Sequence, residues 1–306
     1  MTEESTPGSF CPAPDAATLA RLEAILKNPA YRRADRDPDW IDSPEMRGAR
    51  LLLEYTKPQV TFARMGVNST VVLFGGTRIV EECKAQEKLA AAQSAAEKNP
   101  GDEELRLRVR RAEKILEKSR YYEVAREFAH MVSLEYQGVD QRDMVVVTGG
   151  GPGVMEAGNR GAFEAGRKSI GLNITLPHEQ APNSFITPEL CFQFRYFALR
   201  KMHFLAAAKA LVAFPGGFGT LDELFETLCL VQTKIIEPVP IILVGEKFWR
   251  RVFDADYLLE EGVIDPEDLR LFSFAETAEE IRKTIIDFYK GTDDPFSGPG
   301  PYMSAM

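Results

Sequence analysis

Three glycine-rich turns in this sequence could hold a phosphate group. They are Gly75–Arg78 (GGTR), Gly149–Gly153 (GGGPG) and Pro215–Thr220 (PGGFGT), and each follows an apolar run typical of a buried strand. Ligands of open parallel sheets lie at the carboxyl ends of the strands, so we expect the turns to converge on one crevice. Glycines let the backbone approach a ligand, and the helix that follows offers free N–H groups and a positive dipole end. The candidate substrate-binding residues are Gly76, Thr77, Gly150, Gly151, Met155, Glu156, Lys201, Gly216, Gly217, Gly219 and Thr220.

Two common nucleotide motifs do not fit these turns. The G-x-G-x-x-G spacing fails because Gly151-x-Gly153 is followed by Glu156, and Gly217-x-Gly219 by Asp222. A carboxylate at that place is a poor neighbour for a pyrophosphate. The sequence also contains no G-x-x-x-x-G-K-[ST] loop, so neither dinucleotide binding nor Walker-type ATP binding is predicted.

Charged residues beside the turns admit two interpretations each. Thr220-x-x-Glu223 fits a capping box, in which Glu223 only reaches back to the backbone, but Glu223 could also act on a substrate. Glu156 lies early in a predicted helix, where a negative side chain suits the dipole. Arg200 and Lys201 are adjacent cations that cannot share one helix face, so one could point into the crevice, although a solvated pair is the simpler interpretation.

The runs GGGPGVMEAGNRGAFEAGRKSIGLNITLPHEQAPN (149–183), FRYFALRKMHF (194–204) and PGGFGTLDELFE (215–226) resemble the LOG (LONELY GUY) family, often labelled lysine decarboxylase. The resemblance covers roughly residues 68–290, less a helical insert. It implies a phosphoribohydrolase that releases the base from a purine nucleoside 5′-monophosphate, such as an N6-modified adenine (cytokinin) nucleotide. It also implies that Arg200 and Glu223 are the catalytic residues and that Gly217–Thr220 holds the 5′-phosphate. Members of the family complete their pockets at subunit contacts, which implies a homo-oligomer, a dimer or a hexamer.

This reaction suits the two implied catalytic residues. Cleavage of an N-glycosidic bond passes through a cationic, oxocarbenium-like sugar, by analogy with O-glycosidases. A carboxylate such as Glu223 could stabilise that cation or activate water. The guanidinium of Arg200 stays protonated, so it could hold the phosphate or ribose, or donate to the departing base. For Glu223 and for Arg200 alike, the residues alone do not decide between these roles.

Two other functions compete with this one. A pyridoxal phosphate decarboxylase needs a Schiff-base lysine, and only Lys201 and Lys234 lie near the motif helices, neither in a recognisable cofactor motif. A nucleotide-binding sensor without turnover would keep the pocket but has no need of both Arg200 and Glu223. We therefore expect an enzyme that uses no cofactor.

The elements that must position these residues alternate between strands and helices. Such alternation predicts an α/β fold with a Rossmann-like parallel sheet flanked by helices. The predicted strands are Thr70–Phe74, Met144–Thr148, Ser169–Ile174, Ala210–Phe214 and Val239–Val244. The predicted helices are Val154–Ala165, Phe197–Ala208, Leu221–Lys234, Phe248–Leu259 and 277–290.

The predicted domain organisation has three parts. Residues 1–66 form a tail and a helical extension, with an amphipathic helix at 15–27, a loop at 31–44 and a longer helix that runs toward Met65. Residues 67–290 form the catalytic domain, and residues 291–306 form a Gly/Pro-rich tail. The charged segment 81–136 is a helical insert, which we predict to be two long helices joined at Asn99–Asp102. It is as well explained by a solvated arm as by an oligomer contact.

Composition limits the partners. The chain has 306 residues, 44% of them apolar, and a net charge of −9, so a nucleic-acid polymer is not expected without a local basic patch. The sequence has four cysteines without a C-x-x-C pair and only three histidines, so no metal site is predicted. The cysteines are expected to be the reduced thiols of a cytoplasmic protein.

The N-terminus lacks signal-peptide character, and no apolar run is long enough to span a membrane. The aromatic stretch Phe192–Phe197 is the expected apolar surface for self-association.

Overall fold

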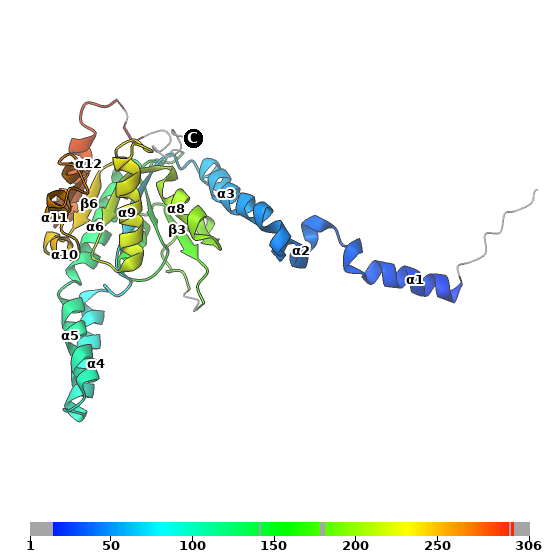
Figure 1. Ribbon diagram of the computed structural model, residues 1–306, viewed down its shortest axis with the longest axis horizontal. Helices are drawn as coiled ribbons and strands as arrows, with labels where there is room; N and C mark the ends of the chain where they lie inside the picture. Colours follow the sequence, from blue (N-terminus) through cyan, green and yellow to red (C-terminus); the bar gives the residue numbers. More distant parts are fainter. Residues whose placement is uncertain (1–14, 141, 178–180, 294, 297–306) are drawn as a thin grey trace, which may run out of the picture. The chain divides into compact units, whose positions relative to one another are not determined.

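The computed structural model describes residues 15–140, 142–177, 181–293 and 295–296, arranged as two compact units (Figure 1). The units divide between Leu53 and Glu54, inside α3 (Arg47–Arg64). The domain limits that the sequence predicts, at 66/67 and 290/291, remain predictions. Cys11, His178 and most of the tail at 291–306 lie outside the described residues.

The first unit is helical. The expected amphipathic helix forms as α1 (Ala16–Lys27), because the Asp15 carboxylate caps it by accepting from the Thr18 N–H at 2.7 Å. The segment 31–44 is not only loop: it contains the short helix α2 (Pro38–Asp42), which the Asp37 side chain caps. The longer helix expected toward Met65 is α3.

The second unit is built on a parallel sheet of seven strands in the order β4-β3-β2-β1-β5-β6-β7. All five predicted strands are present, with small shifts at three of them. Two short strands were missed, β4 and β7, which lie at the two edges of the sheet. The strands are β1 (Thr70–Phe74), β2 (Val145–Thr148), β3 (Ser169–Ile174), β4 (Cys191–Phe194), β5 (Ala208–Ala213), β6 (Ile241–Val244) and β7 (Phe272–Ala275).

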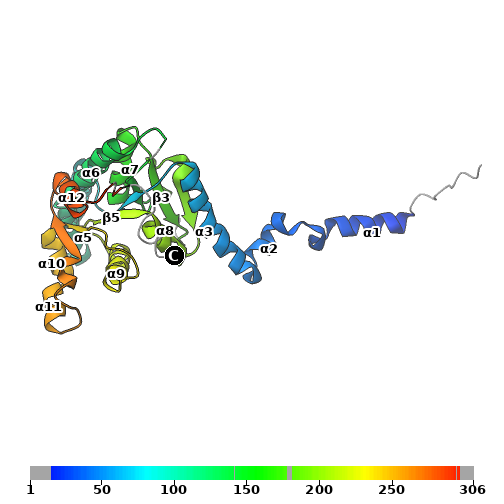
Figure 2. The ribbon, with the colours of Figure 1, turned by 90° about the horizontal axis from the view of Figure 1, so that it is seen from above.

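Helices cover both faces of the sheet (Figure 2). One face carries α6, α7 and α12, and the other carries α8, α9 and α10. Strand side chains alternate accordingly: Val72 and Phe74 face α8, whereas Val71 and Leu73 face the α6–α7 side. The helices are α4 (Glu82–Lys98), α5 (Glu103–Leu116), α6 (Arg120–Tyr136), α7 (Val154–Glu164), α8 (Phe197–Ala206), α9 (Phe218–Gln232), α10 (Glu246–Val252), α11 (Ala255–Glu260) and α12 (Ala278–Phe288).

The segment 81–136 contains three helices instead of the two that were predicted. The helix expected after the 99–102 turn breaks at 117–119, where α5 ends and α6 begins. Helix α6 is a core element, because it buries Tyr122, Ala125, Phe128 and Ala129 on one face. It packs closely on α7, where a Cβ at Gly161 would lie 2.1 Å from a backbone oxygen of α6. The true insert is the α4–α5 hairpin, which projects beyond the sheet in Figure 1.

Two further expectations are wrong in detail. The helix predicted at Phe248–Leu259 is interrupted, because Phe253 is extended and the Asp254 side chain starts α11 by accepting from Tyr257 N–H. The stretch Phe192–Phe197 is not a continuous apolar surface. Phe192 and Phe194 point inward from β4 and are 6% and 1% exposed, whereas Phe197 is half exposed.

Candidate active site

The strand order places a topological switch point between β1 and β5. The chain builds outward from β1 through β2 and β3 to β4, and then returns to the other side of β1 with β5. At such a point the connections leave in opposite directions and open a crevice at the carboxyl ends of the strands. The turns Gly75–Arg78 and Pro215–Thr220 follow these two strands.

All three glycine turns meet at this edge, as the sequence predicted. The N–H of Gly76 donates to the Pro215 carbonyl at 2.9 Å, and the N–H of Val154 donates to the Gly76 carbonyl at 3.3 Å. Gly153 has a φ of +76°, and a Cβ there would lie 2.4 Å from the Gly76 oxygen. The close backbone contact therefore requires glycine.

Helix α9 begins three residues earlier than predicted and leaves its first turn open. Its N-cap is Gly217, which supplies no capping side chain. Gly217 and Gly219 have nothing within 4 Å of the positions where a Cβ would stand, and the Phe218 side chain is 90% exposed. The first N–H groups of a helix have no intrahelical acceptor, so this turn can receive an anion such as a phosphate.

The early start of α9 excludes the capping box at Thr220. Thr220 already lies inside the helix, and Glu223 lies one turn further on, only 7% exposed. In the described structure the Glu223 carboxylate has no hydrogen-bond partner, and the Glu223 carbonyl accepts from the Thr227 hydroxyl at 2.8 Å. Burial raises the pKa of Glu223 to about 7, although the charges of Lys201 and Arg200 lower it. This carboxyl group can change its protonation state near neutral pH.

Arg200 lies on α8 with its guanidinium close to the Gly149–Gly153 turn. Its Nε donates to the Leu172 carbonyl of β3 at 2.8 Å, and its guanidinium carbon lies 5.1 Å from the Phe204 ring centre. Burial lowers the pKa of Arg200, while the charges of Glu223 and Asp222 oppose that effect. The guanidinium still remains protonated at physiological pH. Arg200 and Glu223 therefore form an electrostatically coupled pair, and Arg200 is not the solvated cation of the simpler interpretation.

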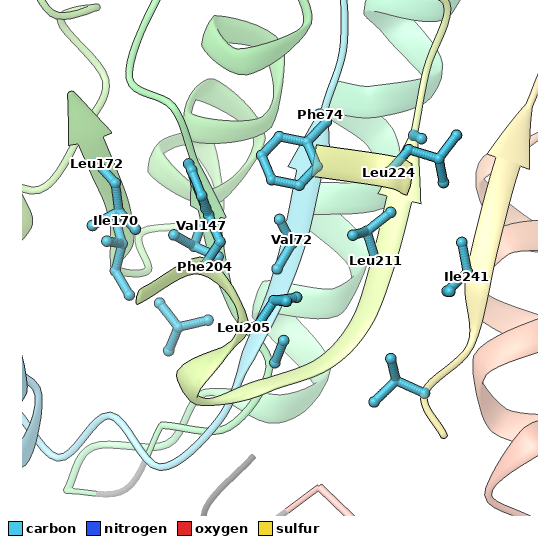
Figure 3. Packing of buried hydrophobic residues seen from close by; sticks show 14 of the residues in the cluster. Val72, Phe74, Val147, Ile170, Leu172, Phe204, Leu205, Leu211, Leu224 and Ile241 are labelled. Atoms are coloured by element: carbon cyan, nitrogen blue, oxygen red, sulfur yellow. The ribbon is translucent and has the colours of Figure 1, made fainter. Parts of the chain in front are cut away.

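The core holds both helices in place. Figure 3 shows Phe204 and Leu205 of α8 and Leu224 of α9 packed among strand residues such as Val72 and Leu211. Phe204 is one helical turn from Arg200, and Leu224 directly follows Glu223. The apolar faces of α8 and α9 thus orient the two polar residues toward the carboxyl edge of the sheet.

Lys201 has a different position from the one expected. Its ammonium group pairs with Glu226 at 2.8 Å and Asp222 at 2.9 Å, so it bridges α8 to α9. Burial opposes its charge, but the two carboxylates outweigh burial and raise the pKa of Lys201. Lys201 contributes a positive potential beside Glu223, while two carboxylates hold its ammonium group.

Met155 lies in the site, whereas Glu156 belongs to another cluster. The Met155 sulfur would be 2.9 Å from a Cβ at Gly149, next to Arg200. The Glu156 carboxylate accepts from the Tyr122 hydroxyl of α6 at 3.0 Å. Its position in the first turn of α7 agrees with the helix-start interpretation.

Sequence reasoning missed the asparagines that support the second turn. The Asn183 side chain donates to the carbonyls of Gly150 and Gly151 at 3.2 and 3.1 Å, and to Asn159 Oδ1 at 2.9 Å. The Thr148 hydroxyl also donates to Asn159 Oδ1, at 2.7 Å. The one signal in the sequence was a polar residue, Asn159, on the otherwise small and apolar buried face of α7.

A cavity of about 540 Å³ adjoins the first and third turns. Its lining includes Gly76, Thr77, Gly216 and Gly217. Its lining also includes Arg78 and Phe218 of these two turns, and three residues that the sequence did not assign to the site: Ile115, Lys118 and Phe248. The cavity is large enough for a small ligand.

Two absences complete the description of the site. Across the described ranges, no group of three His, Cys, Asp or Glu side chains is arranged to hold a metal ion. Within the same ranges, no helix has the length and apolar character needed to cross a bilayer.

Comparisons with known proteins relate this chain to nucleotide-cleaving enzymes. Residues 155–285 match a family described as "Possible lysine decarboxylase". The chain is 28% identical over 189 residues to a probable cytokinin riboside 5′-monophosphate phosphoribohydrolase of Oryza sativa subsp. japonica, LOGL3, covering 59% of this chain and 83% of that one. It is 31% identical over 152 residues to the Arabidopsis thaliana enzyme LOG1, covering 48% of this chain and 70% of that one.

Two similar solved structures are each 20% identical in sequence to this chain. One is the structural-genomics target TM1055, with a TM-score of 0.42 over 72% of this chain and 99% of that one. Another is the molybdenum cofactor carrier protein of Chlamydomonas reinhardtii, with a TM-score of 0.35 over 55% of this chain and 89% of that one. The sequence relationship is the more informative, and by it the chain belongs to the LOG family, that of the cytokinin riboside 5′-monophosphate phosphoribohydrolases.

Proposed function

We propose that the protein hydrolyses the N-glycosidic bond of a purine nucleoside 5′-monophosphate, giving free base and ribose 5-phosphate. The observation that carries the proposal is the buried Glu223 carboxyl, with a pKa near 7, beside Arg200 and one turn from the uncapped start of α9. Cleavage of the C–N bond of a nucleotide requires a site for the phosphate and a carboxyl group that can ionise near neutral pH, and α9 carries both.

The chemistry divides among the chain's own residues. The 5′-phosphate binds at the open N–H groups of Gly217–Gly219, which places the ribose over the next turn of α9. The C1′–N bond breaks with its electron pair going to the base, and Glu223 as a carboxylate stabilises the sugar cation. Water then adds to C1′ and loses a proton, and the departing base gains one. The Nε of Arg200 is held by Leu172, which leaves its terminal N–H groups for the phosphate, the ribose or the departing base.

A pyridoxal phosphate decarboxylase fits this site poorly. A Schiff-base lysine must lose its proton, whereas two carboxylates hold Lys201 as ammonium. A silent sensor would not need the buried, ionisable Glu223 beside Arg200, since burying an ionisable carboxyl without a hydrogen bond carries a free-energy cost.

A nucleotide panel tests the proposal. Purified protein is incubated with AMP, isopentenyl-AMP, GMP and the matching nucleosides, and free base is measured by chromatography. We expect base release from at least one purine nucleotide and a much lower rate on its nucleoside. Equal rates on both would show that the α9 turn is not a phosphate site, and absence of base release from every nucleotide would favour the sensor.

The preferred base is part of the same proposal. The relatives' names favour an N6-modified adenine nucleotide.

We also propose that the protein is a cytoplasmic homo-oligomer, a dimer or a hexamer. The half-exposed aromatic side chain of Phe197, close to Arg200, is the candidate contact between subunits. Light scattering at working concentration should give at least a dimer, and a stable monomer would refute this part.

A further inference from the structure

A groove runs between the α4–α5 hairpin and the sheet domain; its walls are mostly apolar surface, and lysines and arginines contribute to its lining. Three cavities of about 500, 540 and 480 Å³ share lining residues: Arg78 and Ile115 join the first to the second, and Lys118 and Phe248 join the second to the third. The second cavity is the one that reaches the glycine turns. The cations that line the three cavities are Arg78, Lys88, Arg110, Arg111, Lys114, Lys118, Arg120, Lys247 and Arg251, and together they define the basic groove.

Helical periodicity brings several cations of the basic groove to one side of α5. Arg111, Lys114 and Lys118 are spaced i, i+3 and i+7 along and just beyond α5, so they share one side of the helix. Glu113 lines a different cavity together with Glu82. Among the described residues, Glu117 is the one carboxylate that lines the groove.

Most of these charges are unpaired. In the described structure, no carboxylate lies within 4.0 Å of Arg78, Lys88, Arg110, Arg111, Lys247 or Arg251. Elsewhere on α5 the arginines are paired, Arg106 with Glu103 at 2.7 Å and Arg108 with Glu104 at 2.6 Å. The ammonium of Lys118 donates to the Lys114 carbonyl at 3.0 Å, and burial lowers the pKa of Lys118. A bound anion would favour its charged form.

This arrangement differs from the charge of the whole chain. The protein carries a net charge of −9, yet nine cations line the groove with one carboxylate. Two of these cations are paired, Lys114 with Glu117 at 2.7 Å and Arg120 with Glu276 at 2.6 Å. A single phosphate at the start of α9 does not need so many cations. Concave sites of this size hold small molecules, and the negative charge of the whole chain repels long polyanions.

We propose that the basic groove binds a small ligand that carries two or more phosphates in series, such as a nucleoside triphosphate or inorganic tripolyphosphate. The chain of phosphates lies along α5, beside the cations of the basic groove. This ligand is additional to the monophosphate substrate of the proposed function, and its binding does not use Arg200 or Glu223.

Calorimetric titration of the full-length protein with tripolyphosphate, ATP and AMP tests the proposal. We expect tripolyphosphate and ATP to bind with affinity that falls steeply as salt rises, because exposed ion pairs are screened. Tighter binding of ATP than of tripolyphosphate would show that the nucleoside is also recognised, and equal binding would show that the phosphate chain suffices.

Matched variants on one helix separate the groove from general charge. The double variant Arg110→Gln with Arg111→Gln should weaken tripolyphosphate binding about tenfold or more, because it removes two charged donors. The control Arg106→Gln with Arg108→Gln removes the same charge from paired positions and should change binding less than threefold, a non-specific effect of about 0.6 kcal/mol or less. Glu223→Gln should bind tripolyphosphate as the wild type does, which keeps this test independent of the proposed reaction.

Four results would overturn the proposal. Tripolyphosphate could fail to bind at low salt, or both double variants could weaken it equally. A short single-stranded RNA could bind more tightly than tripolyphosphate and lose affinity in the Arg110/Arg111 variant, which would make the groove a polymer site. The groove variant could instead shift the oligomeric state in light scattering with no change in anion binding, which would make the groove an interface between copies.

Discussion

The guanidinium of Arg200 occupies space that is open because residue 149 is glycine. A Cβ built on Gly149 would lie 2.6 Å from Nη2 of Arg200, closer than van der Waals contact allows. The turn after β2 and the middle of α8, about 50 residues apart in sequence, are thus fitted to each other at the site.

Gly149→Ala should displace Arg200 and lower kcat/KM by roughly 10- to 100-fold, because small misplacements of a catalytic group are costly. Gly101→Ala is the control, since nothing lies within 4 Å of its Cβ position. Steady-state kinetics with the best nucleotide of the panel makes the comparison. Wild-type rates for Gly149→Ala would mean that the position of Arg200 does not matter for turnover.

Glu223→Gln should lower kcat by about 10²–10⁴-fold, the range for loss of a catalytic proton-transfer or charge-stabilising group. A nearly silent substitution was the expectation for a capping residue, and the start of α9 at Phe218 removes that explanation. Glu226→Gln, one turn along the same helix, should cost less than about tenfold, because it acts only through Lys201.

The pH profile of the wild type should show the same group. Because burial raises the pKa of Glu223 to about 7 and the carboxylate is the active form, kcat/KM should rise between pH 6 and 8. A rate that falls over this interval would instead make Glu223 an acid that protonates the departing base.

Ionisation of Glu223 should lower the stability of the folded protein over the pH range in which it raises activity. The folded-state pKa lies above the unfolded value, so the protonated carboxyl is favoured in the folded protein, and its contribution to the free energy of unfolding is lost as pH rises from about 4.5 to 7. Relative to the wild type, Glu223→Gln should therefore gain stability over this interval, by roughly 3 kcal/mol at alkaline pH. Urea unfolding of both proteins at pH 5 and pH 8.5 measures the difference. A difference that is the same at both pH values would contradict the raised pKa.

Asn183→Ala should loosen the Gly150–Gly151 turn. It removes the side-chain donor of the Gly151 carbonyl and leaves the Gly150 carbonyl with the backbone N–H of Asn183, which should lower the free energy of unfolding by about 1–3 kcal/mol. Activity should fall by about tenfold as well, because this turn lies against Asn173 and Arg200. Asn99→Ala, at the exposed tip of the hairpin, is the control for both measurements, and equal effects of the two substitutions would exclude a special role for Asn183.

Local patterns in the chain were enough to predict most of the fold. A strand buried on both faces must be apolar along its whole length, so runs such as Thr70–Phe74 identified the sheet and the turns that follow it. Edge strands have no such requirement: β4 alternates buried Phe192 with exposed Gln193, and β7 is only partly covered, so both were missed. Helix α6 was misassigned because its exposed Glu and Arg residues hide the buried face that packs on α7.

The site required the tertiary structure, because its decisive properties depend on contacts between distant segments. The spacing Thr220-x-x-Glu223 is compatible with a cap or with catalysis, and the choice depends on where α9 begins against the sheet. The raised pKa of Glu223 comes from burial under packed helices, and the basic groove forms only when α5 is folded back near Arg78. Desolvation and electrostatic coupling depend on three-dimensional distance, which neighbouring positions in a sequence do not specify.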